Sequence, residues 1–455
     1  MHELMLGLGV ATYALVGHDR RGLEDYRAAA SHDFEDDEMD RAKRVPCPAF
    51  ERTARERCGL LPMRPSPWAT ARRERLASES SRSLLLRRLI MGASAQLTIE
   101  RLDVRAVEVP MRIPLQTSSG TIRIAPLALL DLHTSEGVTG RTYLFCYTPL
   151  VLKPVCNLIA NLESTLQGVP LAPLQLNRML HSRFRLLGSK GVVGMALAGV
   201  DMAAWDALAR VQGQPLARAL GADRVEVGAY NSCGLGLIGA DLAPPEAESL
   251  VASGFTAIKV RLGYPTLETD LKVVRAVKSA IGGNVHLMSD YNQALSVPDA
   301  LHRVRALADE GLYWIEEPCL AQDYQGYARV RAASTCPIQM GENWWGPAEM
   351  AASLAAGASD LGMPDAMKIG GVTGWMQAAA LAESAGLPIS THLFPEVSVH
   401  LLAATPTRHW LEFVDWASPI LAQPMEIKSG KASFTEAPGS GIEWDEAAVS
   451  RYLAH

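Results

Sequence analysis

The chain opens its patterned part with alternating apolar and polar positions. Residues 97–110 alternate in this way, which is typical of a half-buried β-strand. Residues 127–132 form a second apolar run, and a Ser-Glu-Gly turn at 135–137 separates it from a third at 138–143. Short runs joined by turn residues predict a meander or hairpin of an antiparallel sheet.

Helical spacing follows these strands. Residues 150–166 and 194–211 carry apolar side chains three and four positions apart, as the buried face of a helix requires. Strands followed by a separate group of helices indicate an α+β domain. We assign residues 95–226 to this domain.

From about residue 227 the pattern alternates short apolar strands with amphipathic helices. We expect strands at 255–260, 285–288, 312–315, 338–340, 361–369, 389–393 and 410–413. We expect helices between several of them, at 271–281, 298–308, 348–355 and 373–385. This alternation predicts βαβ units and a parallel sheet. The number of units fits a closed (β/α) barrel at 227–415 better than an open sheet, with 416–455 packing back on the first domain.

Residues 1–94 lack this regularity. Residues 1–90 hold 15 arginines and one lysine, and an acidic run at 33–38 nearly cancels their charge. An arginine-rich tract can mark a nucleic-acid-binding or transit segment, but the acidic run disfavours both. Glu3 and the missing basic start disfavour a secretory signal. We predict a disordered or non-native extension, with the working protein beginning near Met91.

Composition narrows the class of protein. The chain is 48% hydrophobic and 20% charged, which excludes a wholly disordered protein. No apolar run reaches about 18 residues, so no membrane span is expected. A net charge of −6 argues against nucleic acid as the main partner. The seven cysteines are scattered and form no Cys-x-x-Cys pair, which predicts reduced thiols and a cytoplasmic location.

Polar residues capable of chemistry stand where the predicted barrel strands end. They are Lys259, Arg261, Asp290, Glu316, Glu342, Asp365, His392 and Glu412. From Lys259 onward the intervals between successive units run from 20 to 31 residues, about one βα unit each. In a barrel such positions meet at one mouth, where active sites are built. Any one acid alone could be a helix cap or a surface residue, but the regular phasing of the series disfavours that reading.

Three of these residues are carboxylates on adjacent predicted strands. Like charges in a pocket of low dielectric repel, so the group requires a cation. Ligands that are all oxygen favour Mg²⁺, Mn²⁺ or Ca²⁺ over Zn²⁺. The predicted metal ligands are Asp290, Glu316 and Glu342.

The segments around these residues resemble the enolase superfamily, and within it the mandelate racemase subgroup. They read KVRLGYP at 259–265, SDYNQ at 289–293, WIEEP at 314–318, MGENW at 340–344, MPDAMKIGGVTGW at 363–375, THLF at 391–394 and HLLAATPTRHWLE at 400–412. The resemblance covers about residues 95–455. It implies an α/β fold, a modified TIM (β/α) barrel with an N-terminal α+β capping domain, and an enzyme that binds Mg²⁺, for which Mn²⁺ can substitute.

The resemblance also implies roles for single residues. Lys259 matches the lysine that neutralises a substrate carboxylate oxygen, and Glu412 matches the acid that hydrogen-bonds the other oxygen. His392 matches a general base held by Asp365. Removing a proton α to a carboxylate creates an enediolate dianion, and Mg²⁺, Lys259 and a protonated Glu412 would bind that charge. Imidazole titrates near neutral pH, which suits it to the role of base.

Substrate contacts and partners follow from the same resemblance. The polar contacts match Asn292 and Ser232, and the loop and wall that close over the substrate match Leu115, Thr117, Ser119, Ile122 and Tyr147. The implied partner is a small-molecule carboxylate. A homo-oligomer, an octamer in many members, is implied as well.

One position departs from the family pattern. Family racemases carry Lys-x-Lys on the strand that here holds Lys259, and the second lysine is the base on the opposite face of the substrate; here that position is Arg261. Guanidinium, with a pKa above about 12, is a poor base at neutral pH. The remaining resemblance narrowly favours an isomerase, a racemase or epimerase of 2-hydroxy carboxylates. The alternative is a hydro-lyase, an acid-sugar dehydratase in which His392 alone removes a proton and then returns one to a leaving hydroxide.

Two other classes fit less well. A non-catalytic scaffold would have no use for buried charges, which are costly to retain. A dinucleotide enzyme is disfavoured because Gly7-Leu8-Gly9 lacks the third glycine and the surrounding strand–turn–helix pattern.

Overall fold

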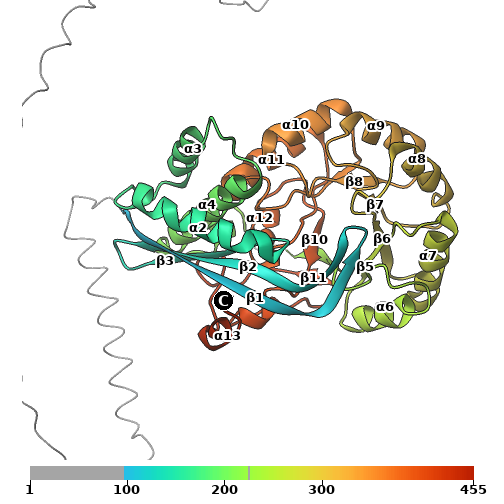
Figure 1. The fold of residues 1–455 in the computed structure, drawn as a ribbon, viewed down its shortest axis with the longest axis horizontal. Helices are drawn as coiled ribbons and strands as arrows, with labels where there is room; N and C mark the ends of the chain where they lie inside the picture. The colour runs from blue at the N-terminus through green and yellow to red at the C-terminus, as the bar shows by residue number, and fades with distance from the viewer. Residues whose placement is uncertain (1–96, 224–225, 455) are drawn as a thin grey trace, which may run out of the picture. The chain divides into compact units, whose positions relative to one another are not determined.

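The computed structural model describes residues 97–223 and 226–454. The predictions for residues 1–94, including a working start near Met91, lie outside these residues. Figure 1 shows an antiparallel sheet with its helices beside a ring of strands surrounded by helices. The fold is therefore the predicted one, a modified TIM barrel with an N-terminal capping sheet.

The capping sheet has three antiparallel strands in the order β1-β2-β3. They are β1 (Ile99–Thr117), β2 (Gly120–Thr134) and β3 (Thr139–Phe145). The sequence pattern ended the first strand at Pro110, but β1 continues to Thr117. A register shift between Pro110 and Leu115 accommodates the proline, which cannot donate a ladder hydrogen bond. The longer strands carry the β1–β2 hairpin toward the barrel (Figure 1).

Helices cover one face of this sheet. They are α2 (Pro149–Leu166), α3 (Pro173–Arg183), α4 (Gly191–Val211) and the short α5 (Leu216–Ala219). The Thr148 side chain caps α2 by accepting a hydrogen bond from the backbone N–H of Leu150. Among the described residues, only α4 is long and apolar enough to cross a membrane, and 78% of its most apolar window is buried inside the protein. It is the central helix of the capping domain's core.

The barrel strands run parallel, in the order β10-β4-β5-β6-β7-β8-β9. They are β4 (Val227–Asn231), β5 (Ala257–Arg261), β6 (His286–Asp290), β7 (Ile315–Glu316), β8 (Ile338–Met340), β9 (Leu361–Gly362) and β10 (Trp410–Phe413), and the short β11 (Lys431–Ala432) pairs antiparallel with β4. Ile389 closes the ring because it bridges Gly362 on one side and Arg408 on the other.

Two predicted strands differ from the structure. The strand expected at 361–369 ends at Gly362, because the Asp365 carboxylate accepts hydrogen bonds from the backbone N–H groups of Met367 and Lys368 and so stabilises a turn. The strand expected at 389–393 is a paired segment rather than a full strand, with isolated bridges from Ile389 to Gly362 and Arg408 and from His392 to Asp365. Both differences lie where the chain presents catalytic candidates.

Helices surround the barrel (Figure 1). They are α6 (Ala243–Ala252), α7 (Leu267–Ile281), α8 (Val297–Ala306), α9 (Tyr324–Ala333), α10 (Pro347–Ala356), α11 (Gly371–Ala385) and α12 (Pro395–Ala403), followed by η1 (Ser418–Ile420) and α13 (Glu446–Arg451). The predicted helices match α7, α8, α10 and α11. The five cysteines in the described part of the chain are free and buried, as the scattered spacing indicated.

The C-terminal end of the chain returns to the capping sheet. The indole N–H of Trp444 donates to Asp131 Oδ1 at 2.9 Å, and the backbone N–H of Glu108 donates to the Tyr452 oxygen at 2.8 Å. These bonds fix the capping sheet, and with it the β1–β2 hairpin, against segments that follow the barrel.

Candidate active site

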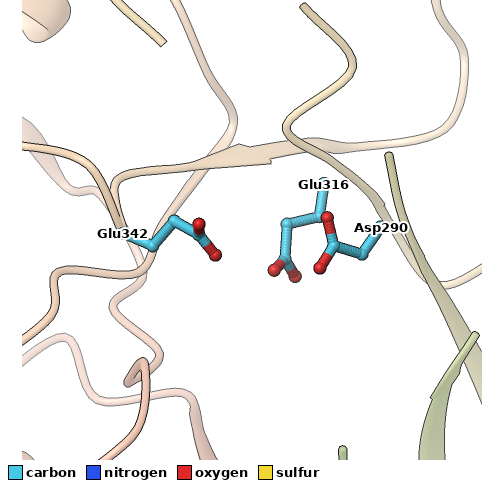
Figure 2. A group of neighbouring side chains, drawn as sticks. All are labelled: Asp290, Glu316 and Glu342. Atoms are coloured by element: carbon cyan, nitrogen blue, oxygen red, sulfur yellow. The ribbon is translucent and has the colours of Figure 1, made fainter. Parts of the chain in front are cut away.

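Three carboxylates meet at the carboxyl ends of neighbouring strands. Asp290 ends β6, Glu316 ends β7, and Glu342 follows β8 by two residues. All three are buried, and one oxygen from each lies within 4.8 Å of the others. Figure 2 shows Glu342 pointing toward Asp290 and Glu316 across the mouth of the barrel. The predicted triad therefore forms one site.

The donor set of this site suits Mg²⁺. Every donor is a carboxylate oxygen, the ligand type that hard divalent cations prefer. Burial and the charges of Asp290, Glu412 and Glu342 outweigh the opposing effect of Lys259 and raise the pKa of Glu316 to about 8. Carboxylates held together at such a cost are stabilised by a divalent ion, so the residues present fit the metal.

Neighbouring side chains hold two of the ligands in place. Asn292 donates to both oxygens of Asp290, from its backbone N–H at 2.8 Å and from Nδ2 at 2.9 Å. Trp314 Nε1 donates to Glu316 Oε2 at 3.0 Å. The structure thus places Asn292, predicted as a substrate contact, on a metal ligand.

Lys259 lies at the centre of the acidic site. Its Nζ is 2.5 Å from Glu316 Oε1, 2.9 Å from Glu412 Oε1 and 3.5 Å from Asp290 Oδ2. Burial lowers the pKa of this lysine, but the charges of Glu316 and Glu412 outweigh burial and raise it well above its usual value. The surrounding carboxylates therefore favour the cationic form of Lys259 beside the metal ligands.

His392 and Asp365 form the predicted pair. His392 Nδ1 lies 2.7 Å from Asp365 Oδ2, while Nε2 faces the metal site and is 3.3 Å from Glu342 Oε2. Burial lowers the pKa of His392, but Glu342, Glu412 and Asp365 outweigh it and raise it to about 9. Asp365 fixes the ring so that Nε2 is the atom presented to the site.

Glu412 is held between Lys259 and the backbone. Its Oε2 accepts from the N–H of Leu393 at 2.8 Å, and its Oε1 pairs with Lys259. Burial raises the pKa of Glu412, but Lys259, His392 and the Leu393 N–H outweigh burial and lower it to about 2. The role of a protonated Glu412, which the family resemblance implied, stays a prediction.

Arg261 is tied to the loop after β4. Its Nη1 donates to the backbone oxygens of Ser232 at 2.9 Å and Gly234 at 3.0 Å, and its Nη2 donates to Ser232 Oγ at 2.7 Å. Its Nε is buried without a hydrogen-bond partner and lies 3.9 Å from Asp290 Oδ2. Three of the five guanidinium N–H groups are used in this way, so Nε–H and one Nη2–H are left for a ligand. Ser232, predicted to contact substrate, accepts two of these hydrogen bonds.

The predicted wall comes from the capping domain. Leu115 pairs with Ile122 across the β1–β2 hairpin, while Thr117 and Ser119 bond to one another within its tip. The neighbouring Ser118 Oγ reaches the Asn292 carbonyl at 3.5 Å, which brings this hairpin to the metal-binding strand ends. The role of these residues as a wall stays a prediction, and Ser119 is exposed.

Tyr147, predicted as part of the wall, follows β3. Its side chain is half-buried, its hydroxyl is buried without a hydrogen-bond partner, and its φ of 58° is in the left-handed region. Burial raises the pKa of Tyr147, and the carboxylates of Asp365, Glu342 and Glu317 raise it further. The Tyr147 hydroxyl therefore lies near these acidic groups. A buried hydroxyl without a partner is suited to bind a ligand atom.

A second polar cluster beside the triad was not anticipated. It consists of Glu317, Asn343 and Lys368, all within the segments that carried the family resemblance. The doubled acid of Glu316-Glu317 was the available signal, since two adjacent buried acids are unusual. The roles of Asn343 and Lys368 depend on loop geometry that spacing does not reveal.

Comparisons with known proteins agree with this geometry. Residues 100–221 match the N-terminal domain family of mandelate racemase and muconate lactonizing enzyme, and residues 244–448 match the enolase C-terminal domain-like family. The chain is 33% identical over 264 residues to L-talarate/galactarate dehydratase of Salmonella typhimurium, a match spanning 58% of this chain and 66% of that enzyme. It is 30% identical over 295 residues to D-galactarolactone cycloisomerase of Agrobacterium fabrum, covering 60% of this chain and 78% of that enzyme.

A solved structure is closer in sequence. An enolase from Bradyrhizobium, complexed with magnesium and mandelic acid, is 42% identical, with a TM-score of 0.76. The match covers 80% of this chain and all of that one. Similar proteins thus include dehydratases, cycloisomerases and a mandelate-binding enolase.

Proposed function

Because the chain belongs to the mandelate racemase and muconate lactonizing enzyme subgroup of the enolase superfamily, we propose that it removes the α-proton of a 2-hydroxy carboxylate in an Mg²⁺-dependent reaction. One observation carries the proposal. The imidazole Nε2 of His392, backed by Asp365, faces the Asp290–Glu316–Glu342 triad across a gap set by its 3.3 Å distance to Glu342.

The charge of each group determines its role in the proposed reaction. Mg²⁺ bound by the triad would supply a Lewis acid for the substrate carboxylate. Lys259 would neutralise one carboxylate oxygen as negative charge develops there. His392 would take the α-proton at Nε2, while Asp365 holds the ring through Nδ1. The product of this step is an enediolate.

The position of Arg261 favours loss of water as the fate of that enediolate. Three hydrogen bonds hold its guanidinium on residues 232–234, and guanidinium rarely loses a proton. No second base is therefore available at this strand. His392 would return its proton to a departing β-hydroxide, which leaves as water, and the resulting enol would become a 2-keto acid. Dehydratases among the similar proteins support this acid-sugar reaction.

Racemisation or epimerisation is the second candidate. The Bradyrhizobium enolase, 42% identical, was solved with mandelic acid. A wall of Leu115, Ile122 and Tyr147, as the family resemblance implies, would suit an aryl group.

A homo-octamer and a cytoplasmic location remain predictions.

Proton NMR in D₂O separates the two reactions. The enzyme is incubated with Mg²⁺ and each enantiomer of mandelate, and then with a set of acid sugars. A keto product from an acid sugar, with exchange of the α-proton in one configuration only, is the expected result. Inversion of mandelate selects racemisation instead. No α-proton exchange with any of these acids, in enzyme shown to bind Mg²⁺, contradicts the proposal as a whole.

A further inference from the structure

The cluster of Glu317, Asn343 and Lys368 touches the metal site at one point. Asn343 Nδ2 donates to Glu317 Oε2 at 2.8 Å and to the metal-ligand oxygen Glu342 Oε1 at 3.1 Å. On its other side Asn343 Oδ1 accepts from Lys368 Nζ at 2.7 Å. Glu317 and Lys368 are buried, so these bonds form away from water.

The charges at the two ends determine how the Asn343 amide is oriented. Its oxygen faces an ammonium group and its nitrogen faces two carboxylates. A flipped amide would set NH₂ against Lys368 and the oxygen against Glu317 and Glu342, which is unfavourable at both ends. Lys368 therefore selects the orientation in which Asn343 donates to Glu342.

We propose that Lys368 is a positioning residue for the metal ligand Glu342, acting through Asn343. The bond from Asn343 engages Oε1 and leaves Glu342 Oε2 directed toward the space that His392 Nε2 also faces. Outer partners of this kind commonly alter metal affinity about 10- to 100-fold when removed. The inference rests on the metal site of the proposed function and is independent of the fate of the enediolate.

Lys368 also contacts the capping domain. Its Nζ lies 4.5 Å from the centre of the Tyr147 ring, a cation–π contact. Tyr147 follows β3 and belongs to the predicted wall. Lys368 therefore contacts this wall residue directly and the ligand Glu342 through Asn343.

The test measures Mg²⁺ binding by calorimetry in the absence of substrate. Lys368→Met, which keeps the aliphatic stem, is expected to weaken Mg²⁺ binding about 10-fold or more. Lys368→Gln, which keeps a donor for Asn343, is expected to recover part of the loss. Lys278→Met is the matched control, because Lys278 donates only to the backbone oxygens of Glu310 and Gly311 on the outside of the barrel; its Mg²⁺ affinity is expected to equal that of the wild type.

A double variant tests the route through Asn343. If Lys368 acts through that amide, Lys368→Met combined with Asn343→Leu binds Mg²⁺ no more weakly than Asn343→Leu alone. Additive losses, or an unchanged affinity in Lys368→Met, overturn the inference. If Lys368→Met does not fold, Lys368→Gln and Asn343→Leu carry the same comparison. Asp290→Asn distinguishes the premises: unchanged Mg²⁺ binding there contradicts the metal site itself.

Discussion

Arg261 holds Ser232 at two points, through Nη1 to its backbone oxygen at 2.9 Å and through Nη2 to its hydroxyl at 2.7 Å. The residue that replaces the second lysine of the family pattern is therefore part of the loop's framework. It keeps positive charge next to Asp290 without offering a lone pair.

Arg261→Lys should introduce the second base. A lysine at this position loses the fork that binds Ser232, so its amine is free to face the substrate. We expect α-proton exchange from the opposite configuration and measurable inversion of a 2-hydroxy acid, both by NMR in D₂O. Arg261→Met, which frees the loop without adding a base, is the control. If Arg261→Lys shows no α-proton exchange from the opposite configuration, the replacement of lysine by Arg261 does not explain the absence of a second base.

Asp365→Asn should abolish most turnover while leaving the metal site intact. The amide cannot stabilise the imidazolium that forms when His392 takes a proton, and it favours the wrong ring tautomer. The expected loss in kcat is about 10³-fold or more. Mg²⁺ affinity, measured by calorimetry, should change much less. Comparable losses in kcat and in Mg²⁺ affinity would show that Asp365 stabilises the whole site rather than the imidazole of His392 in particular.

Protein stability should fall as the pH drops from about 6.5 to 4, in part because of His400. Burial lowers the pKa of this histidine to about 4, while Nδ1 accepts from the Ala217 N–H and Nε2 faces the Ser440 oxygen. Between these pH values His400 is protonated in the unfolded chain but not in the folded protein. The free energy of unfolding therefore falls by up to about 1.4 kcal/mol for each pH unit of acidification.

His400→Asn provides the measurement. Urea unfolding is followed at several pH values for both proteins, and the variant should show the flatter dependence between pH 6.5 and 4. Above pH 6.5 the difference between the two free energies of unfolding should be constant. Parallel curves across the whole range would exclude His400 as the source.

Gly140→Ala should destabilise the capping domain. A Cβ at Gly140, on β3, would lie 2.1 Å from the Ala203 oxygen and 2.6 Å from the Ala207 nitrogen, both in the backbone of α4. The helix must move away from the sheet, at a cost of about 1–3 kcal/mol. Gly283→Ala is the control, because nothing lies within 4 Å of its Cβ position. Equal free energies of unfolding for the two variants would contradict this close approach.

The sequence was sufficient for the parts of the site that regular structure positions. Asp290 and Glu316 end parallel strands that pair directly, so strand spacing alone predicts that they meet. The pairing of His392 with Asp365 was implied by the family resemblance, and the two residues form an isolated bridge between adjacent segments. The barrel and its capping sheet were likewise predictable from strand spacing.

Contacts made by loops were not predictable. The anchoring of Arg261 depends on the path of residues 232–234, which carry a positive φ at Gly234. The contact of Lys368 with Tyr147 joins positions far apart in the chain, each in irregular backbone. The strand before Asp365 is short because the Asp365 carboxylate accepts a backbone hydrogen bond from Met367 as well as binding His392. The alternation of apolar residues does not encode such a bond.

The β1–β2 hairpin carries Leu115 and Ile122, the predicted apolar wall, whereas every group proposed to handle charge or protons belongs to the barrel. A substitution in the hairpin would therefore alter the predicted wall without replacing any barrel residue assigned to charge neutralisation or proton transfer.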